Sequence, residues 1–70
     1  MRASNVRETL LSYDNGAPLY QVEGLFECDP DGFDRNEARS ILLSGKKCDL
    51  IMEKGSFAEN GVKLTLYYTQ

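Results

Sequence analysis

The stretch richest in groups that could do chemistry is ECDPDGFDRNEA, which begins at Glu27. Aligned with a calcium-binding loop, Glu27, Asp29 and Asp31 fall at the first, third and fifth positions, and Gly32 at the sixth. The alignment fails at the twelfth position, which requires a bidentate glutamate and is occupied by Ala38. We therefore expect no calcium site in this segment, and no other metal or cofactor in the protein.

The same segment has the pattern of a turn followed by the start of a helix. Its proline fixes φ for a turn, and Asp31-Gly32 supplies residues that tolerate positive φ. Asp34 is in position to cap a helix, and Glu37 follows at the spacing of a capping box. The pattern predicts a helix that begins at Asp34 and runs to about Ser44.

The groups that most enzymes and zinc sites depend on are missing from the chain. There is no histidine, so a serine or cysteine nucleophile lacks its usual base, and Cys28 and Cys48 cannot complete a zinc site. We therefore expect no catalytic residues and a protein that is not an enzyme. Whether the two cysteines form a disulfide stays open, although the absence of a secretion signal favours reduced thiols and a cytoplasmic location.

Length and composition limit the class of protein. The chain of 70 residues predicts a single compact domain over residues 1–70, and 41% hydrophobic with 27% charged residues is ordinary for a globular protein. The formal net charge of −3 argues against a nucleic-acid binder, which usually carries a basic surface. No apolar run is long enough to span a membrane, so we expect no membrane association.

The C-terminal third predicts a β-hairpin over residues 48–69. GVKLTLYYT alternates apolar and polar residues, with Val62 at the start of the apolar series, and CDLIMEKGSF before it has the composition of a strand. Between the two strands, Asn60-Gly61 suits a type I′ turn.

The N-terminal third predicts one further strand, LYQVEGLFEC, preceded by a segment that fits two structures. As a strand, residues 5–15 would turn at Asn15-Gly16 and place Leu11 opposite Tyr20. As a helix, the same residues show a capping box and one apolar face. The strand interpretation predicts an α+β fold, a four-stranded antiparallel sheet with one helix on one face in the order ββαββ. The alternative is αβαββ with an N-terminal helix.

The two faces of the predicted sheet lead to the functional hypothesis. The face under the helix is expected to hold Leu11, Tyr20, Val22, Phe26, Leu50, Met52, Val62, Leu64, Leu66 and Tyr68. The opposite face would then expose Leu10, Leu19, Leu25, Ile51 and Tyr67, with Glu23, Glu27, Glu53 and Lys63 around them. An apolar patch of this kind is rarely left uncovered in a monomer. The predicted partner-binding residues are Leu19, Glu23, Leu25, Ile51, Glu53 and Tyr67.

These features favour a small non-enzymatic protein-binding module. One form is a phage or mobile-element inhibitor that docks on a larger host protein, such as a defence or regulatory factor, in the host cytoplasm. The alternative is a self-assembling structural or accessory protein, in which the same face closes a homodimer. A weaker alternative is a small nucleic-acid-binding regulator. It would use the basic residues Arg35, Arg39, Lys46 and Lys47.

Overall fold

The computed structural model describes residues 1–70, apart from the side chain of Asp14, and shows an α+β fold. The elements are β1 (Ala3–Asp14), β2 (Ala17–Glu27), the 3₁₀ turn η1 (Pro30–Gly32), α1 (Arg35–Leu42), β3 (Asp49–Ala58) and β4 (Gly61–Thr69). The predicted order ββαββ is confirmed. The alternative with an N-terminal helix is wrong, because that segment forms β1.

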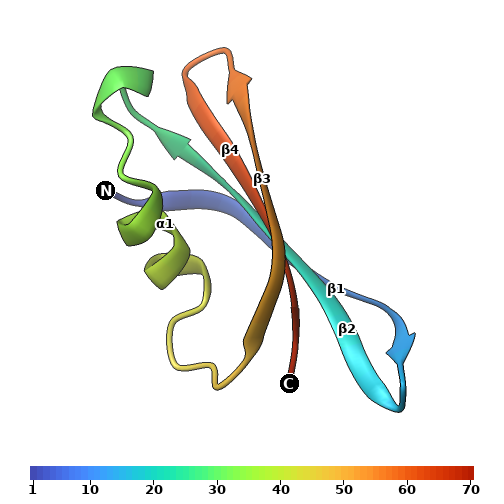
Figure 1. Ribbon diagram of the computed structural model, residues 1–70. Helices are drawn as coiled ribbons and strands as arrows, with labels where there is room; N and C mark the ends of the chain where they lie inside the picture. Colours follow the sequence, from blue (N-terminus) through green and yellow to red (C-terminus); the bar gives the residue numbers. More distant parts are fainter.

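The four strands make one antiparallel sheet in the order β1-β2-β4-β3, so β2 and β4 are central and β1 and β3 are the edges. The sheet is strongly twisted, and α1 packs against one of its faces while the β1–β2 turn extends away from the helix (Figure 1). We call the face under α1 the covered face and the opposite face the open face.

The core lies between α1 and the two central strands. The side chains that form it come from alternating positions of β2 and β4 and from the inner side of α1. They are Val22, Phe26, Ala38, Leu42, Leu64, Leu66 and Tyr68, none more than 5% exposed. Phe33, just before the helix, packs its ring edge against Phe26 at 5.8 Å between centroids. The alternation predicted for β2 and β4 is confirmed.

The start of α1 follows from its capping residue. The Asp34 carboxylate accepts hydrogen bonds from the backbone amides of Asn36 (3.0 Å) and Glu37 (3.2 Å), which satisfies two of the free donors at the helix start. The predicted cap is therefore confirmed. The helix is shorter than predicted, ending at Leu42, and Gly45 with φ of 75° follows in the left-handed conformation.

The two hairpin turns differ in their chemistry. Asn15 and Gly16 have φ of 52° and 84° and close the β1–β2 hairpin, as predicted for a type I′ turn. In the second hairpin Ala58 pairs with Gly61, so the turn residues are Glu59 and Asn60. The predicted Asn60-Gly61 turn is therefore wrong. Gly61 belongs to β4, where a side chain would overlap the Phe26 carbonyl.

A β-bulge at Leu11 changes the predicted register of β1. Ser12 pairs with Leu19 as expected from the two-residue turn, but the register shifts before Leu10, which pairs with Tyr20. The prediction that Leu11 lies opposite Tyr20 is therefore wrong, and Leu10 belongs to the covered face. One inserted residue reverses the side of every residue beyond it.

A second bulge, at Ile51, has the same consequence in β3. Leu50 pairs with Tyr68 on the covered face, as predicted, but the register shifts and Met52 pairs with Tyr67. Met52 therefore lies on the open face, and Glu53, opposite Leu66, lies on the covered face. Both were predicted on the other side, so both assignments are corrected.

Candidate protein-binding surface

Exposed apolar side chains are concentrated on the two edge strands. The large apolar residues with the greatest exposure are Met1, Val6, Leu10, Leu11, Tyr13, Leu50, Ile51, Met52 and Phe57, from 37% to 83%. All of them except Met1 belong to β1 or β3. The exposed apolar side chains therefore lie along the two edges of the sheet and not across the middle of the open face, where the patch was predicted.

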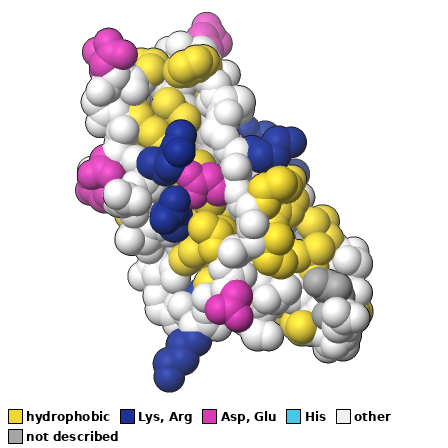
Figure 2. Space-filling model, in the orientation of Figure 1, with side chains coloured by type: hydrophobic (Ala, Val, Ile, Leu, Met, Phe, Trp, Pro, Cys, Tyr) yellow, Lys and Arg dark blue, Asp and Glu magenta, His cyan; other side chains and the backbone are white. Residues whose placement is uncertain are grey.

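One group lies where β3 bulges, and Leu10, Leu11 and Tyr13 form another around the bulge of β1. Leu50 points to the covered face and Met52 to the open face, with Ile51 inserted between them, so three consecutive apolar residues surround the sheet edge. Tyr67, half-buried on β4, pairs with Met52 and extends the group onto the open face. We call these four residues the β3 patch. Figure 2 shows hydrophobic side chains gathered in the middle and on the right of the view.

The structure brings only some of the predicted site residues together. Leu19 is half-buried on the open face, opposite Thr69 and diagonal to Tyr67, so it borders the β3 patch. Leu25 is also half-buried on the open face, but it pairs with Lys63 farther along the sheet. Ile51 and Tyr67 belong to the patch itself.

Glu23 lies on the open face and is paired with a lysine. Its carboxylate is 3.2 Å from the Lys63 ammonium group. Glu23 and Leu25 also line a shallow hollow of about 420 Å³, to which Arg7 and Lys63 contribute. These polar groups separate Leu25 from the β3 patch.

Glu53 was predicted at the rim of the open face, and the structure places it on the covered face against α1. The Arg39 guanidinium donates from Nε (2.9 Å) and Nη2 (2.6 Å) to one carboxylate oxygen, and Arg35 Nε lies 3.1 Å from the other. The Glu53 side chain is only 14% exposed. Its position shows that this residue ties the edge strand to the helix.

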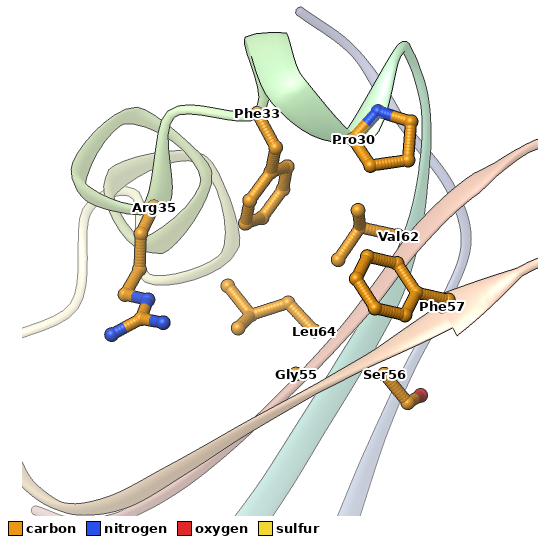
Figure 3. A pocket seen from close by; sticks show the side chains of 8 residues that line it. All are labelled: Pro30, Phe33, Arg35, Gly55, Ser56, Phe57, Val62 and Leu64. Carbon is orange, nitrogen blue, oxygen red and sulfur yellow. The ribbon is translucent and has the colours of Figure 1, made fainter.

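A hollow of about 510 Å³ opens on the covered face beside this ion pair. Figure 3 shows the side chains of Phe33, Phe57, Val62 and Leu64 directed toward one another around it, with Arg35 at one side. Phe57 is 83% exposed, so this wall of the hollow is open to solvent. The hollow is therefore an open depression with both apolar and polar lining, and not an enclosed pocket.

A cluster that was not predicted closes the other end of the covered face. The Tyr68 hydroxyl donates a hydrogen bond to the Glu8 carboxylate, and the Lys46 ammonium group lies 3.1 Å from the same oxygen. Tyr20 stacks on Tyr68 with 5.4 Å between ring centroids. The expected register placed Glu8 on the open face, so the sequence signal for this contact was hidden by the bulge.

Electrostatics within this cluster shift two pKa values. The Tyr68 hydrogen bond, with Lys46 beside it, holds the pKa of Glu8 below its usual range. Burial, together with the Glu8 carboxylate, raises the pKa of the Tyr68 hydroxyl. The neutral tyrosine and the ionised glutamate are therefore the favoured pair.

Several of the residues considered for metal binding and nucleic-acid binding have local structural partners. Asp29 accepts a hydrogen bond from the Asp31 amide (3.0 Å) in the turn before α1. The basic residues Arg35, Arg39 and Lys46 are each paired with a carboxylate.

Cys28 and Cys48 are free thiols, half-buried at the edge of the core. Among the described residues, no group of three or more histidine, cysteine, aspartate or glutamate side chains is placed to hold a metal ion. No helix there is long and apolar enough to cross a membrane.

Comparison with known protein families, with curated proteins and with solved structures finds no significant match to this chain.

Proposed function

We propose that the protein is a small non-enzymatic protein-binding module that docks on a larger protein through the β3 patch. The observation that carries the proposal is the clustering of exposed apolar side chains where β3 bulges. Ile51 and Met52 are 54% and 49% exposed, side by side and next to Tyr67. Apolar side chains of this size gain free energy when a partner removes them from water, and tyrosine and methionine are enriched in such interfaces.

The test compares two matched pairs of substitutions. Ile51→Ser with Tyr67→Ser replaces an aliphatic residue and a tyrosine of the β3 patch, and Leu11→Ser with Tyr13→Ser replaces an aliphatic residue and a tyrosine of β1. Leu11, like Ile51, occupies a bulge. A partner captured from the source cells with the unaltered chain is purified, and its affinity for each variant is measured by titration.

We expect the β3 variant to bind the purified partner about 30-fold more weakly, which corresponds to about 2 kcal/mol for interface anchors. The β1 variant should bind as the unaltered chain does. Circular dichroism establishes that both variants fold, and Met52→Ser alone serves if the Tyr67 substitution unfolds the sheet. Equal affinity for all variants would exclude the β3 patch as the binding site.

A second copy of this chain is the alternative occupant of the patch. The free edge of β3 favours it, because exposed strand edges of two copies can pair. Solution mass measured over a dilution series separates the two cases. A mass of one chain at all concentrations supports a different partner, and a persistent double mass supports a homodimer.

The narrower form of the proposal is an inhibitor, encoded by a phage or mobile element, that blocks a host defence or regulatory factor in the host cytoplasm. It predicts that the captured partner loses activity in the complex. A partner that keeps full activity in a saturated complex would contradict inhibition, and only the broader proposal of a binding module would remain.

A further inference from the structure

The free edge of β3 is the more regular of the two edges of the sheet. At an edge strand, alternate residues direct their N–H and C=O groups away from the sheet. Beyond the bulge at Ile51, β3 pairs without interruption from Met52 to Ala58. The other edge, β1, has register shifts on both sides of its middle, and such shifts disturb the outer row of backbone groups. β3 is therefore the better template for an added strand.

Beside this edge the covered face has room for a side chain from such a strand. Gly55 lies in the middle of the regular stretch and pairs with Leu64, which is in the lining of the 510 Å³ hollow. A Cβ atom added at Gly55 would meet nothing within 4 Å. A large apolar side chain opposite Gly55 would therefore enter the hollow between Phe33 and Phe57, because directly opposed residues point to the same face.

Beside the middle of this edge the charges are positive, whereas Asp49 and Glu59 lie at its two ends and the chain as a whole carries −3. Arg35 and Arg39 share the single carboxylate of Glu53, so one positive charge is left over at the hollow. Lys54 is exposed on the open face of the same strand. Complementary charge on a partner would be negative at both places.

We propose that β3 accepts an extended, acidic segment of the partner as an additional strand, with a large apolar side chain of that segment in the hollow over Gly55. Acidic residues directly on either side of that apolar residue point to the open face, where one of them lies opposite Lys54. Backbone hydrogen bonds to the edge supply much of the affinity, and the hollow and the basic groups select the sequence. This inference rests on the proposed binding function and names the partner's chemistry.

The test uses a labelled synthetic peptide, Asp-Val-Glu-Phe-Glu-Val-Asp, with blocked termini and the whole chain as receptor. Fluorescence anisotropy measures its dissociation constant, together with those of three altered peptides. In one the phenylalanine is alanine, in the second the acidic residues are lysine, and in the third alternate backbone nitrogens are methylated. We expect the alanine peptide to bind about tenfold more weakly or worse, because burial of a phenylalanine ring corresponds to about that factor. We expect a similar loss for the other two peptides, because one loses the complementary charge and the other loses backbone hydrogen bonds.

Two receptor variants locate the binding site. Gly55→Phe fills the hollow and should reduce peptide affinity about tenfold, and it should fold because the space beside Gly55 is open. Thr9→Phe adds the same ring to the exposed surface of β1 and should leave the affinity unchanged. Thermal melts of both variants establish that they are folded.

Three results would overturn the inference. They are no detectable binding of the parent peptide, equal binding of the alanine peptide, and full binding by a folded Gly55→Phe variant. If the Ile51 and Tyr67 substitutions still weaken binding of the captured partner, the strand-addition site is wrong and the proposed binding function is retained. If the partner is also indifferent to those two residues, the proposed function fails as well.

Discussion

β3 and β4 are adjacent strands of one hairpin with similar apolar content, and their side chains have opposite environments. On β4, Val62, Leu64, Leu66 and Tyr68 are at most 6% exposed. On β3, Leu50, Ile51, Met52 and Phe57 are between 37% and 83% exposed. The difference arises from position, because β4 has a strand on each side and α1 above it, whereas β3 has one neighbour and a free edge. Apolar residues in a strand thus indicate a core only when neighbours cover them.

The largest expected contrast comes from truncating one apolar side chain on each strand. Leu66→Ala should lower the free energy of unfolding by about 3 kcal/mol, because it leaves a cavity under α1. Met52→Ala should change it by less than about 0.5 kcal/mol, since its side chain is half in solvent. Urea denaturation measures both values. Equal losses would mean that β3 is as well covered as β4.

The second-largest contrast in stability is expected from replacing one glycine on each strand. Gly61→Ala brings a methyl group against the Phe26 carbonyl, which should cost about 2 kcal/mol. Gly55→Ala meets open space and should change stability by less than about 1 kcal/mol. Melting temperatures of the two variants provide the comparison. A strongly destabilised Gly55→Ala variant would show that the hollow beside β3 is already filled.

The ion pairs at Glu53 are the charged link between the edge strand and α1. Glu53→Gln keeps the shape but removes the negative charge shared by Arg35 and Arg39, which should cost about 1 kcal/mol because both arginines are partly solvated. High salt should weaken the unaltered protein more than the variant. A variant of unchanged stability and unchanged salt dependence would contradict this link.

The helix cap should affect the central strand β4 more than the edge strand β3, because β4 packs directly beneath α1. Asp34→Ala removes the acceptor for two backbone amides and should destabilise the protein by about 1 kcal/mol, close to Glu53→Gln in size. Its effect should be seen in hydrogen exchange of β4 beneath the helix. Loss of protection confined to β3 would be the opposite of the expected pattern.

The smallest effect is expected at acid pH, from Glu8. Because the pKa of Glu8 is lowered in the folded protein, its contribution to stability is present above the usual value near 4.5 and is lost as pH falls through the lowered pKa. Glu8→Gln should flatten this acid limb by less than about 1 kcal/mol, since the side chain is partly exposed.

At the alkaline end, stability should fall as pH rises above 10, because Tyr68 resists ionisation in the core.

The contrast between β3 and β4 also shows how far the sequence predicts this protein. Strict alternation made β4 predictable, and Asn15-Gly16 and Asp34 located a turn and a helix start through local chemistry. These signals lie within a few residues of each other, so no tertiary information is needed. The fold class therefore followed from the sequence.

The candidate site was predicted only in part, because bulges have no sequence signature as clear as alternation. Ile51 and Leu11 each insert one residue, and this moved Met52 and Leu10 to the faces opposite to those expected. Strand order was also not readable from the sequence, and it is the order β1-β2-β4-β3 that leaves β3 at an edge. Ile51 and Tyr67 lie on adjacent strands, as the predicted hairpin required.

Hydrogen–deuterium exchange of the whole chain, alone and with its captured partner, tests the central claim most directly, namely that β3 is the binding edge. The account predicts that amides of Met52–Ala58 that face outward exchange at least about tenfold more slowly in the complex, since they gain hydrogen-bond partners. Amides of β1 should exchange as in the free chain. Slower exchange along β1 with no change along β3 would contradict the account.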